Sequence, residues 1–186
     1  MTVQLQRRLF TTDEFFQMVA AGILTKDDRV ELIEGEIVEM PPIGSQHAGV
    51  LNRFVKLFKP VIDTEAVLAF QNPLRLSGDS APQPDVAVLR LRNDYYTDSH
   101  PEPEDVLLLI EIADSSLLSD QRVKAPLYAD AGIPELWIVN LTNLTVEVHR
   151  DPSAAGYLLN SIARRGDSLS PVALPSLSFT VDDLLG

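Results

Sequence analysis

The chain contains no cysteine among its 186 residues, which excludes disulfides and thiolate metal sites. Any metal ion would have to be held by oxygen ligands or by the three histidines. Oxygen ligands suit hard divalent cations such as Mg²⁺ or Mn²⁺. The composition therefore restricts any metal chemistry to hard cations.

Positive charge is also scarce. The sequence holds 15 Lys and Arg against 27 Asp and Glu, a formal net charge of −12. Proteins that bind nucleic acid tightly without sequence preference usually present a basic patch or a basic pI. The charge balance therefore counts against every nuclease hypothesis, although a metal ion or a local cluster such as Arg90 and Arg92 could still meet phosphate.

Long apolar runs are absent too, since none approaches the roughly 18 residues of a membrane helix. The N-terminal stretch "MTVQLQRRLFTTDEFF" lacks a basic segment followed by a long apolar region, so it does not look like a leader. We therefore expect a cytoplasmic protein that uses no membrane. The length, with no repeat and no linker, favours one domain over residues 1–186.

Apolar spacing predicts a mixed α/β sheet with helices against it. The first helix should begin at a capping box formed by Thr11 and Glu14 and stop near Gly22. "DRVELIEGEIVEM" predicts a hairpin that turns at residues 34–35, and residues 45–58 predict a second helix. The central strands should lie around Val67, Val86, Leu108 and Trp137, and the strand-helix-strand run over 106–140 suggests a right-handed crossover.

One carboxylate stands out inside the apolar run "VLLLIEIA". Glu111 shares a strand face with Leu109 and Ala113, and burial of an unpaired carboxylate is costly enough that it needs a proton, a partner or a metal. Asp85 begins the preceding strand. If the two strands are neighbours, their carboxylates could converge, and a divalent cation would relieve the repulsion. An ion pair of Glu111 with a basic residue of the next helix is the plainer alternative.

The helix that follows carries Asp120, Lys124 and Tyr128 at positions i, i+4 and i+8, which form one polar edge on a regular helix. Pro126 complicates this expectation, because a proline deep in a helix costs ~3 kcal/mol or more. Either the helix begins near Ala125, with Pro126 in its first turn, or it is kinked.

The pattern "ELIEGEIVEMPP" followed by His47, then "PDV", then "IEIADSSLLSDQRVKAPLYADAGIPELWIVN", resembles the Uma family of restriction endonucleases within the PD-(D/E)XK nuclease superfamily. The resemblance covers roughly residues 10–150. It implies a restriction-endonuclease-like fold, an α/β (α+β) mixed β-sheet flanked by helices. It also implies hydrolysis of phosphodiester bonds in DNA with Mg²⁺ or Mn²⁺ as cofactor.

The resemblance also implies roles for particular residues. Asp85 and Glu111 match the two metal-binding acids, and Lys124 matches a catalytic lysine that has moved to the following helix. The commoner lysine position, two residues after the second acid, is Ala113 here. Additional site candidates, drawn from the N-terminal motif and from the polar helix edge, are Glu31, His47, Asp120 and Tyr128.

Two function classes remain open. The first is a metal-dependent endonuclease acting on DNA, working as a homodimer whose interface could use the apolar strands near Trp137 and Val146. The second is a non-catalytic binding or scaffold protein that retains the nuclease fold. A basic groove beside Glu111 would favour the enzyme, and an acidic rim would favour the scaffold.

Overall fold

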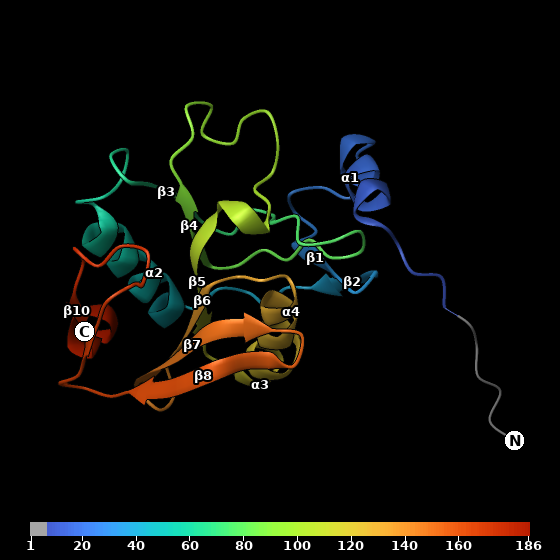
Figure 1. Cartoon of the computed structure of the whole chain (residues 1–186). Helices are drawn as coiled ribbons and strands as arrows, with labels where there is room; N and C mark the ends of the chain where they lie inside the picture. Colours follow the sequence, from blue (N-terminus) through green and yellow to red (C-terminus); the bar gives the residue numbers. More distant parts are fainter. Residues whose placement is uncertain (1–6) are drawn as a thin grey trace, which may run out of the picture.

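A computed structural model describes residues 7–186, which are built on a six-stranded mixed sheet of strand order β3-β4-β5-β6-β7-β8 (Figure 1). Neighbouring strands are antiparallel except β5 and β6, which run parallel across the predicted crossover. The strands are β3 (Ala66–Ala69), β4 (Val86–Arg90), β5 (Val106–Ala113), β6 (Glu135–Asn140), β7 (Thr145–Ser153) and β8 (Gly156–Ala163).

The remaining described elements are two short strand pairs, five α-helices, one 3₁₀ turn and one π turn. The pairs are β1 (Val30–Ile33) with β2 (Glu36–Glu39), and β9 (Ser168–Leu169) with β10 (Phe179–Thr180). The helical elements are α1 (Thr12–Ala20), α2 (Ser45–Phe58), the 3₁₀ turn Pro103–Asp105, α3 (Leu117–Ser119), the π turn Asp120–Lys124, α4 (Ala125–Asp130) and α5 (Val181–Leu185).

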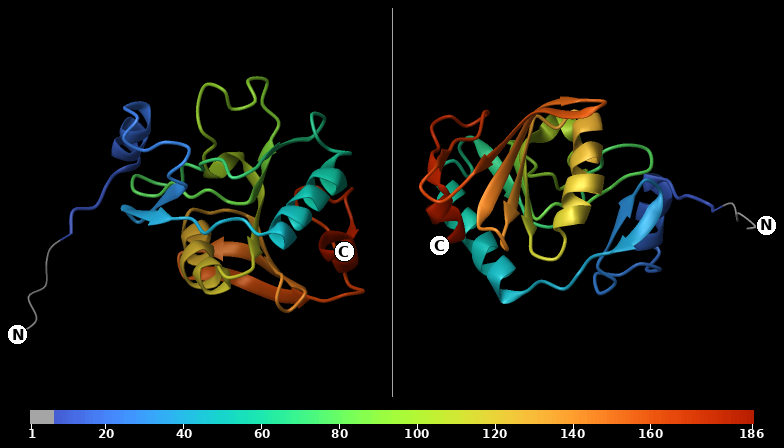
Figure 2. Two further views of the ribbon diagram at one scale, coloured as in Figure 1. Left: turned by 180° about the vertical axis from the view of Figure 1, so that it is seen from behind. Right: turned by 90° about the horizontal axis from the view of Figure 1, so that it is seen from below.

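Helices cover both faces of the sheet, as the view from below shows (Figure 2). Ile110 and Ile112 of β5 pack in the cluster that contains residues of α2 and α5, whereas Leu109 and Ala113 pack in the cluster with α4. The alternation along β5 therefore divides the core into two apolar layers, and Glu111 lies in the layer that faces α4. The expectation of a mixed sheet flanked by helices is confirmed.

The N-terminal elements follow the sequence signals closely. Thr11 caps α1 in a capping box with Glu14, and Gly22 takes a left-handed conformation just after the helix. The β1–β2 hairpin turns at Glu34 and Gly35, and Leu32 bridges to Ala81, which ties the hairpin to the segment before β4. The expectation that the N-terminus carries no leader concerns a stretch whose first six residues lie outside the described range.

The crossover helix is not the regular helix that the sequence suggested. The amide of Ala125 donates to the carbonyl of Asp120, five residues back, so residues 120–124 form a wide π turn before α4 begins. Pro126 is the second residue of α4. The backbone is helical from Leu117 through the π turn to Asp130, so the helix does not begin near Ala125, and the change from π to α winding just before Pro126 accommodates the proline.

Two further expectations meet the structure here. Trp137 and Val146 have no exposed surface, because both pack in the core layer beneath α2. These two side chains therefore cannot contact a second copy, and the homodimer expected from their strands stays a prediction. Among the described residues, no helix has the length and apolar character that a bilayer crossing requires.

Candidate active site

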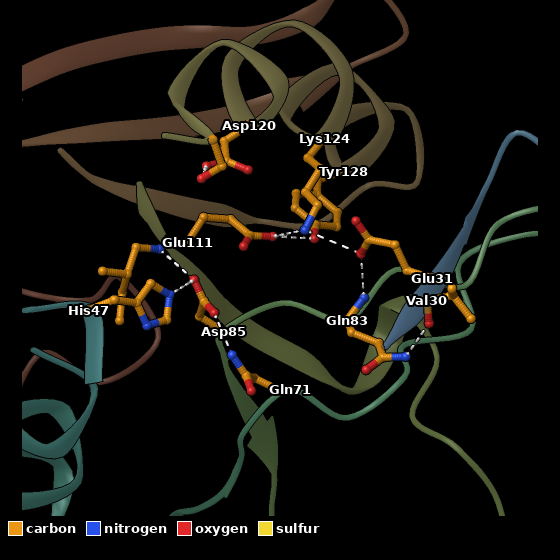
Figure 3. Close-up of polar contacts among 12 residues, drawn as sticks. Val30, Glu31, His47, Gln71, Gln83, Asp85, Glu111, Asp120, Lys124 and Tyr128 are labelled. Carbon is orange, nitrogen blue, oxygen red and sulfur yellow. Dashed lines mark hydrogen bonds and ion pairs between the residues drawn. The ribbon is translucent and has the colours of Figure 1, made fainter. Parts of the chain in front are cut away.

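Adjacent strands bring Asp85 and Glu111 to one place. In the antiparallel pairing of β4 with β5, Val86 lies opposite Ile110, so the preceding residue Asp85 lies across from Glu111. Both side chains are buried, with 8% and 3% of their residue surface exposed. The expectation that these strands are neighbours is confirmed, and Figure 3 shows the two carboxylates side by side.

Three donors hold the carboxylate of Asp85. The ladder between β4 and β5 ends at Val86, and the next free amide of β5, that of Ile112, donates to Asp85 Oδ2 at 2.8 Å. His47 Nε2 lies 2.9 Å from the same oxygen, and Gln71 Nε2 donates to Oδ1 at 3.0 Å. Burial alone would raise the pKa of Asp85, but these donors hold it below its ordinary value. Asp85 is therefore a carboxylate at neutral pH.

Glu111 has a different set of partners. Its Oε1 accepts a hydrogen bond from the Tyr128 hydroxyl at 2.6 Å and lies 3.3 Å from Lys124 Nζ. The same ammonium lies 3.2 Å from Glu31 Oε2, which also accepts the amide of Gln83. Lys124 therefore bridges the carboxylates of β1 and β5, as Figure 3 shows.

Asp120 completes the group on the helical side. It is buried and accepts a hydrogen bond from Ser116 at 2.7 Å. Asp120, Lys124 and Tyr128 all point from the crossover toward Glu111 (Figure 3). The predicted common edge is therefore present, although a π turn and the start of α4 form it, and π turns occur often at functional sites.

Burial and mutual repulsion raise the pKa values of two of these acids. Burial raises the pKa of Glu111 to about 8, opposed by Lys124 and reinforced by Asp120 and Asp85. Burial likewise raises the pKa of Asp120 to about 6. For Lys124 burial favours the neutral amine, but Glu111 and the other carboxylates outweigh it and raise the pKa of the ammonium above its ordinary value. The lysine therefore stays charged.

These side chains line a pocket of about 350 Å³. Two permanent cations, Arg29 and Lys124, belong to its wall. Six carboxylates also line it: Glu31, Glu39, Asp85, Glu111, Asp114 and Asp120. The rim is therefore acidic, which is the outcome that the sequence argument assigned to a non-catalytic protein, unless a cation offsets the charge.

Arg90 and Arg92 do not supply positive charge to this pocket. Arg90 ends β4, at the opposite end of the strand from Asp85. Arg92 forms an ion pair with Asp94, and neither arginine lines the pocket. The cluster therefore lies outside this pocket, and its contact with phosphate stays a prediction.

The donor set fits a hard divalent cation. Within residues 7–186 no three His, Asp or Glu side chains already converge as a metal-binding group. Mg²⁺ needs only one or two carboxylates, however, and completes its shell with water and substrate oxygens. Asp85 and Glu111 supply those two carboxylates, and the raised pKa of Glu111 marks a place where a positive charge would be stabilised.

Sequence reasoning missed two glutamines that hold the acids. The side chain of Gln71 donates to Asp85. The backbone amide of Gln83 donates to Glu31, and its side-chain amide donates to the carbonyl of Val30. Gln71 follows β3 with a φ of 51°, a backbone conformation that no spacing pattern reveals. Gln83 stands just before the "PDV" motif, and that proximity was the one signal that could have identified it.

Comparisons with known proteins identify a family and a similar fold. A family model described as "Uma2: Putative restriction endonuclease" matches residues 12–182. A solved structure, described as a putative nuclease belonging to DUF820 from Anabaena variabilis, is similar with a TM-score of 0.71 and 19% sequence identity. The match covers 95% of this chain and 97% of that one. No curated protein sequence matches the chain.

Proposed function

The chain belongs to the Uma2 family of putative restriction endonucleases, and from that premise we propose that it is a metal-dependent endonuclease that hydrolyses phosphodiester bonds in DNA. One observation carries the proposal: two acids from adjacent strands, Asp85 and Glu111, line one pocket with the buried ammonium of Lys124. Two carboxylates and a lysine in one pocket suit metal-assisted attack of water on a phosphodiester.

Asp85 and Glu111 would hold the cation, Mg²⁺ or Mn²⁺. When bound, it supplies Lewis-acid stabilisation of the phosphoryl charge and lowers the pKa of the attacking water. Lys124, 3.3 Å from Glu111, orients that water or stabilises negative charge in the transition state. Both roles need the ammonium to be charged, which the surrounding carboxylates ensure.

The other candidate residues act through these three. His47 and Gln71 fix the orientation of Asp85, so its free lone pairs keep one direction. Tyr128 does the same for Glu111, and Glu31 holds Lys124 from the far side. Asp120 adds a further carboxylate to the pocket wall, where it can accept from water or substrate.

A homodimer would present two such sites to a duplex and permit cleavage of both strands. Its interface would have to lie elsewhere than at Trp137 and Val146, which are buried. Sedimentation velocity of the purified protein, alone and with a short duplex, tests this part of the proposal: a monomer under both conditions would exclude it.

The acidic pocket favours a second candidate, a non-catalytic protein that retains the nuclease fold. Its six carboxylates face two permanent cations, and one of those cations, Lys124, is held by Glu31 and Glu111. Without a metal ion, such a pocket would repel phosphate.

A plasmid-nicking assay separates the two candidates. We expect the wild type to convert supercoiled plasmid to the nicked form with Mg²⁺ or Mn²⁺, and not with EDTA. Asp85→Asn and Glu111→Gln should each lose at least about 100-fold in rate, in the range seen when a group that stabilises the transition state is removed. Arg165→Gln is the matched control, because Arg165 pairs with Asp182 near the C-terminus and lines no part of the pocket. Wild-type inactivity on DNA with both metals would favour the non-catalytic candidate.

A further inference from the structure

A second pocket, of about 490 Å³, adjoins the carboxylate pocket. The two share Arg29, Met40, Gln71 and Gln83 in their walls. Gln71 and Gln83 therefore have the acids on one side and the second pocket on the other. Whatever occupies the second pocket lies directly beside the groups that would hold the cation.

The second pocket has the opposite charge character. Its wall includes Lys26 and Arg29 and no carboxylate, in a chain with 27 acidic and 15 basic residues. Within residues 7–186 neither Lys26 nor Arg29 forms an ion pair with an acid. This pocket is therefore suited to an anionic group that the acidic pocket would repel unless it held a cation.

The acid nearest to Lys26 along the chain, Asp27, is exposed and lines no part of the pocket. Two further acids, close in sequence to other residues of the pocket, have partners of their own. Asp13 is paired with Arg75, and Asp28 accepts the amide of Thr25 at 2.5 Å and its hydroxyl at 2.8 Å. Both carboxylates have partners of their own, and neither lines the pocket.

Aromatic rings continue from the second pocket into a third. Phe16 of α1 stacks on His100 with ring centroids 4.5 Å apart and planes 19° from parallel. His100 also lines a third pocket, of about 320 Å³, with Tyr95 and Tyr96, and no carboxylate, lysine or arginine belongs to its wall. The second pocket is lined by residues of α1 and the third by residues of β3, and both include His100 of the loop between β4 and β5. In Figure 1 this loop and α1 lie at the end of the molecule opposite the β7–β8 hairpin. The rings of Phe16 and Tyr96 are half-buried and those of Tyr95 and His100 are exposed, so the two pockets together present aromatic faces to solvent.

We propose that the second and third pockets bind an unpaired stretch of nucleic acid whose scissile phosphate lies in the carboxylate pocket. Lys26 and Arg29 contact its phosphates, and its bases stack on the rings of Phe16, His100 and Tyr95. A cationic channel with stacking rings is how proteins bind single strands without sequence preference. A paired duplex keeps its base faces inside the helix and cannot use these rings. The inference rests on the proposed function and names its substrate class.

Fluorescence anisotropy with labelled oligonucleotides tests the inference. The probes are oligothymidylate and oligouridylate of about 12 nucleotides, within the span that such channels bind, and a blunt DNA duplex of the same length. Ca²⁺ replaces Mg²⁺ and Mn²⁺ so that the carboxylate pocket holds a hard cation, and electrophoresis of the probe after each measurement checks that it has not been cleaved. The variants are the double change Lys26→Gln with Arg29→Gln, and the single changes His100→Ala and Tyr95→Ala. The controls are Arg165→Gln and Leu159→Ala, because both residues are exposed and neither lines any of the three pockets. Melting temperatures of all variants check the fold.

We expect the wild type to bind at least one single-stranded probe more tightly than the duplex, and the better probe identifies the preferred sugar. The double variant should bind about 10-fold more weakly, and its slope of log K against log salt should fall by about 1.4, since each phosphate contact on a single strand contributes about 0.7. His100→Ala and Tyr95→Ala should each weaken binding about fivefold or more, because base stacking is lost. If the double variant does not fold, these two exposed single changes carry the test.

Equal affinity of the variants and the wild type would overturn the inference, as would tighter binding of the duplex. Failure of the proposed function gives a different result. Single-strand binding that depends on these residues, with no cleavage in Mg²⁺ or Mn²⁺, overturns the nuclease proposal and leaves the binding site standing. If the double variant and both single variants cleave DNA at the wild-type rate, the nuclease proposal stands and the inferred binding site is overturned.

Discussion

Asp85 and Glu111 line the same pocket, yet their surroundings move their pKa values in opposite directions. Asp85 has three donors, His47 among them, which outweigh its burial. Glu111 has one hydroxyl and an ammonium that it shares with Glu31, and this is not enough to offset complete burial. Asp85 is therefore ionised at neutral pH, whereas the pKa of Glu111 lies well above its ordinary value, so a bound cation would favour the ionised form of Glu111.

The pH dependence of stability follows from this pKa. The pKa of Glu111 is about 8 in the folded protein, above the ordinary value of 4.5 for a glutamic acid, so the folded state binds that proton more tightly than the unfolded state. The resulting stability is fully present below about pH 4.5 and is lost as the pH rises through 8. We expect the free energy of unfolding of the wild type, relative to Glu111→Gln, to fall between pH 5 and 8 in EDTA.

Urea denaturation of both proteins across this range measures the difference. A difference that stays constant from pH 5 to 8 would contradict the account of Glu111. Saturating Mn²⁺ should flatten the dependence in the wild type, because a bound cation favours the ionised carboxylate.

Lys124 should matter for folding as well as for the proposed chemistry. Lys124→Met leaves the buried carboxylates of Glu31 and Glu111 without their shared counterion. Breaking a buried ion pair from one side costs about 3 kcal/mol, so we expect a loss of that size in the free energy of unfolding at pH 8. Lys59→Met, at an exposed position after α2, should change it by less than about 0.5 kcal/mol. Equal effects of the two changes would mean that Lys124 is not a buried counterion.

Among the elements, the crossover between β5 and β6 decides the geometry of the site. A regular helix would place Asp120, Lys124 and Tyr128 on one line, and the π turn over residues 120–124 keeps all three directed toward Glu111. Periodicity predicted the shared side but could not reveal the π turn, because a single wide turn of five residues is too short to establish an apolar spacing of its own. Pro126 was the visible sign that a regular helix had to fail there.

Other elements show where sequence reasoning succeeds and where it stops. The capping box at Thr11 and the bounds of α2 depend on neighbouring residues and were predicted as observed. The apolar neighbours of Trp137 in its strand favoured a core position, and the residue is buried. That β6 pairs with β5 on one side and with β7 on the other depends on the order of the strands, which no local pattern specifies. The contact of Gln71 with Asp85 depends likewise on a left-handed backbone conformation.

Glu135 connects β6, β7 and the segment before β10, so its removal should destabilise the fold. It is fully buried in β6, where Oε1 accepts from Trp137 Nε1 and Arg150 Nε, both at 2.8 Å, and Oε2 accepts the amide of Val172 at 2.7 Å. Glu135→Ala would leave Arg150 without its partner and free the segment before β10. We expect a loss of about 3–5 kcal/mol in the free energy of unfolding, measured by urea denaturation.

The matched control is Glu65→Ala, an exposed glutamate beside β3 that should change the free energy of unfolding by less than about 0.5 kcal/mol. A Glu135→Ala protein as stable as this control would show that the buried network contributes nothing net.

Across the whole molecule, acidic and basic side chains are unevenly distributed, and the two adjoining pockets differ in charge. The net charge of −12 includes six carboxylates around one pocket, while the adjoining pocket has two cations and no acid in its wall. A divalent cation would partly offset the negative charge of the carboxylate pocket, beside the two cations of the adjoining pocket. The overall composition argued against nucleic acid, and only the folded arrangement shows where a polyanion could still be accommodated.

Metal binding should therefore stabilise the whole fold. A ligand that binds only the native state at 100 times its Kd adds about 2.7 kcal/mol to the free energy of unfolding. We expect Mn²⁺ to raise the Tm of the wild type and to leave that of Asp85→Asn unchanged, as measured by calorimetry. A similar increase in both proteins would place the cation elsewhere.

The central claim is that Asp85 and Glu111 hold a cation that serves hydrolysis. The most direct test is isothermal titration of Mn²⁺ and Mg²⁺ into the wild type, Asp85→Asn and Glu111→Gln, with plasmid nicking measured on the same samples. The account predicts one binding event that both substitutions abolish, and nicking that is lost with it. Absent heat, or heat that neither substitution changes, would contradict it and leave Glu111 as the buried ion-pair partner of Lys124.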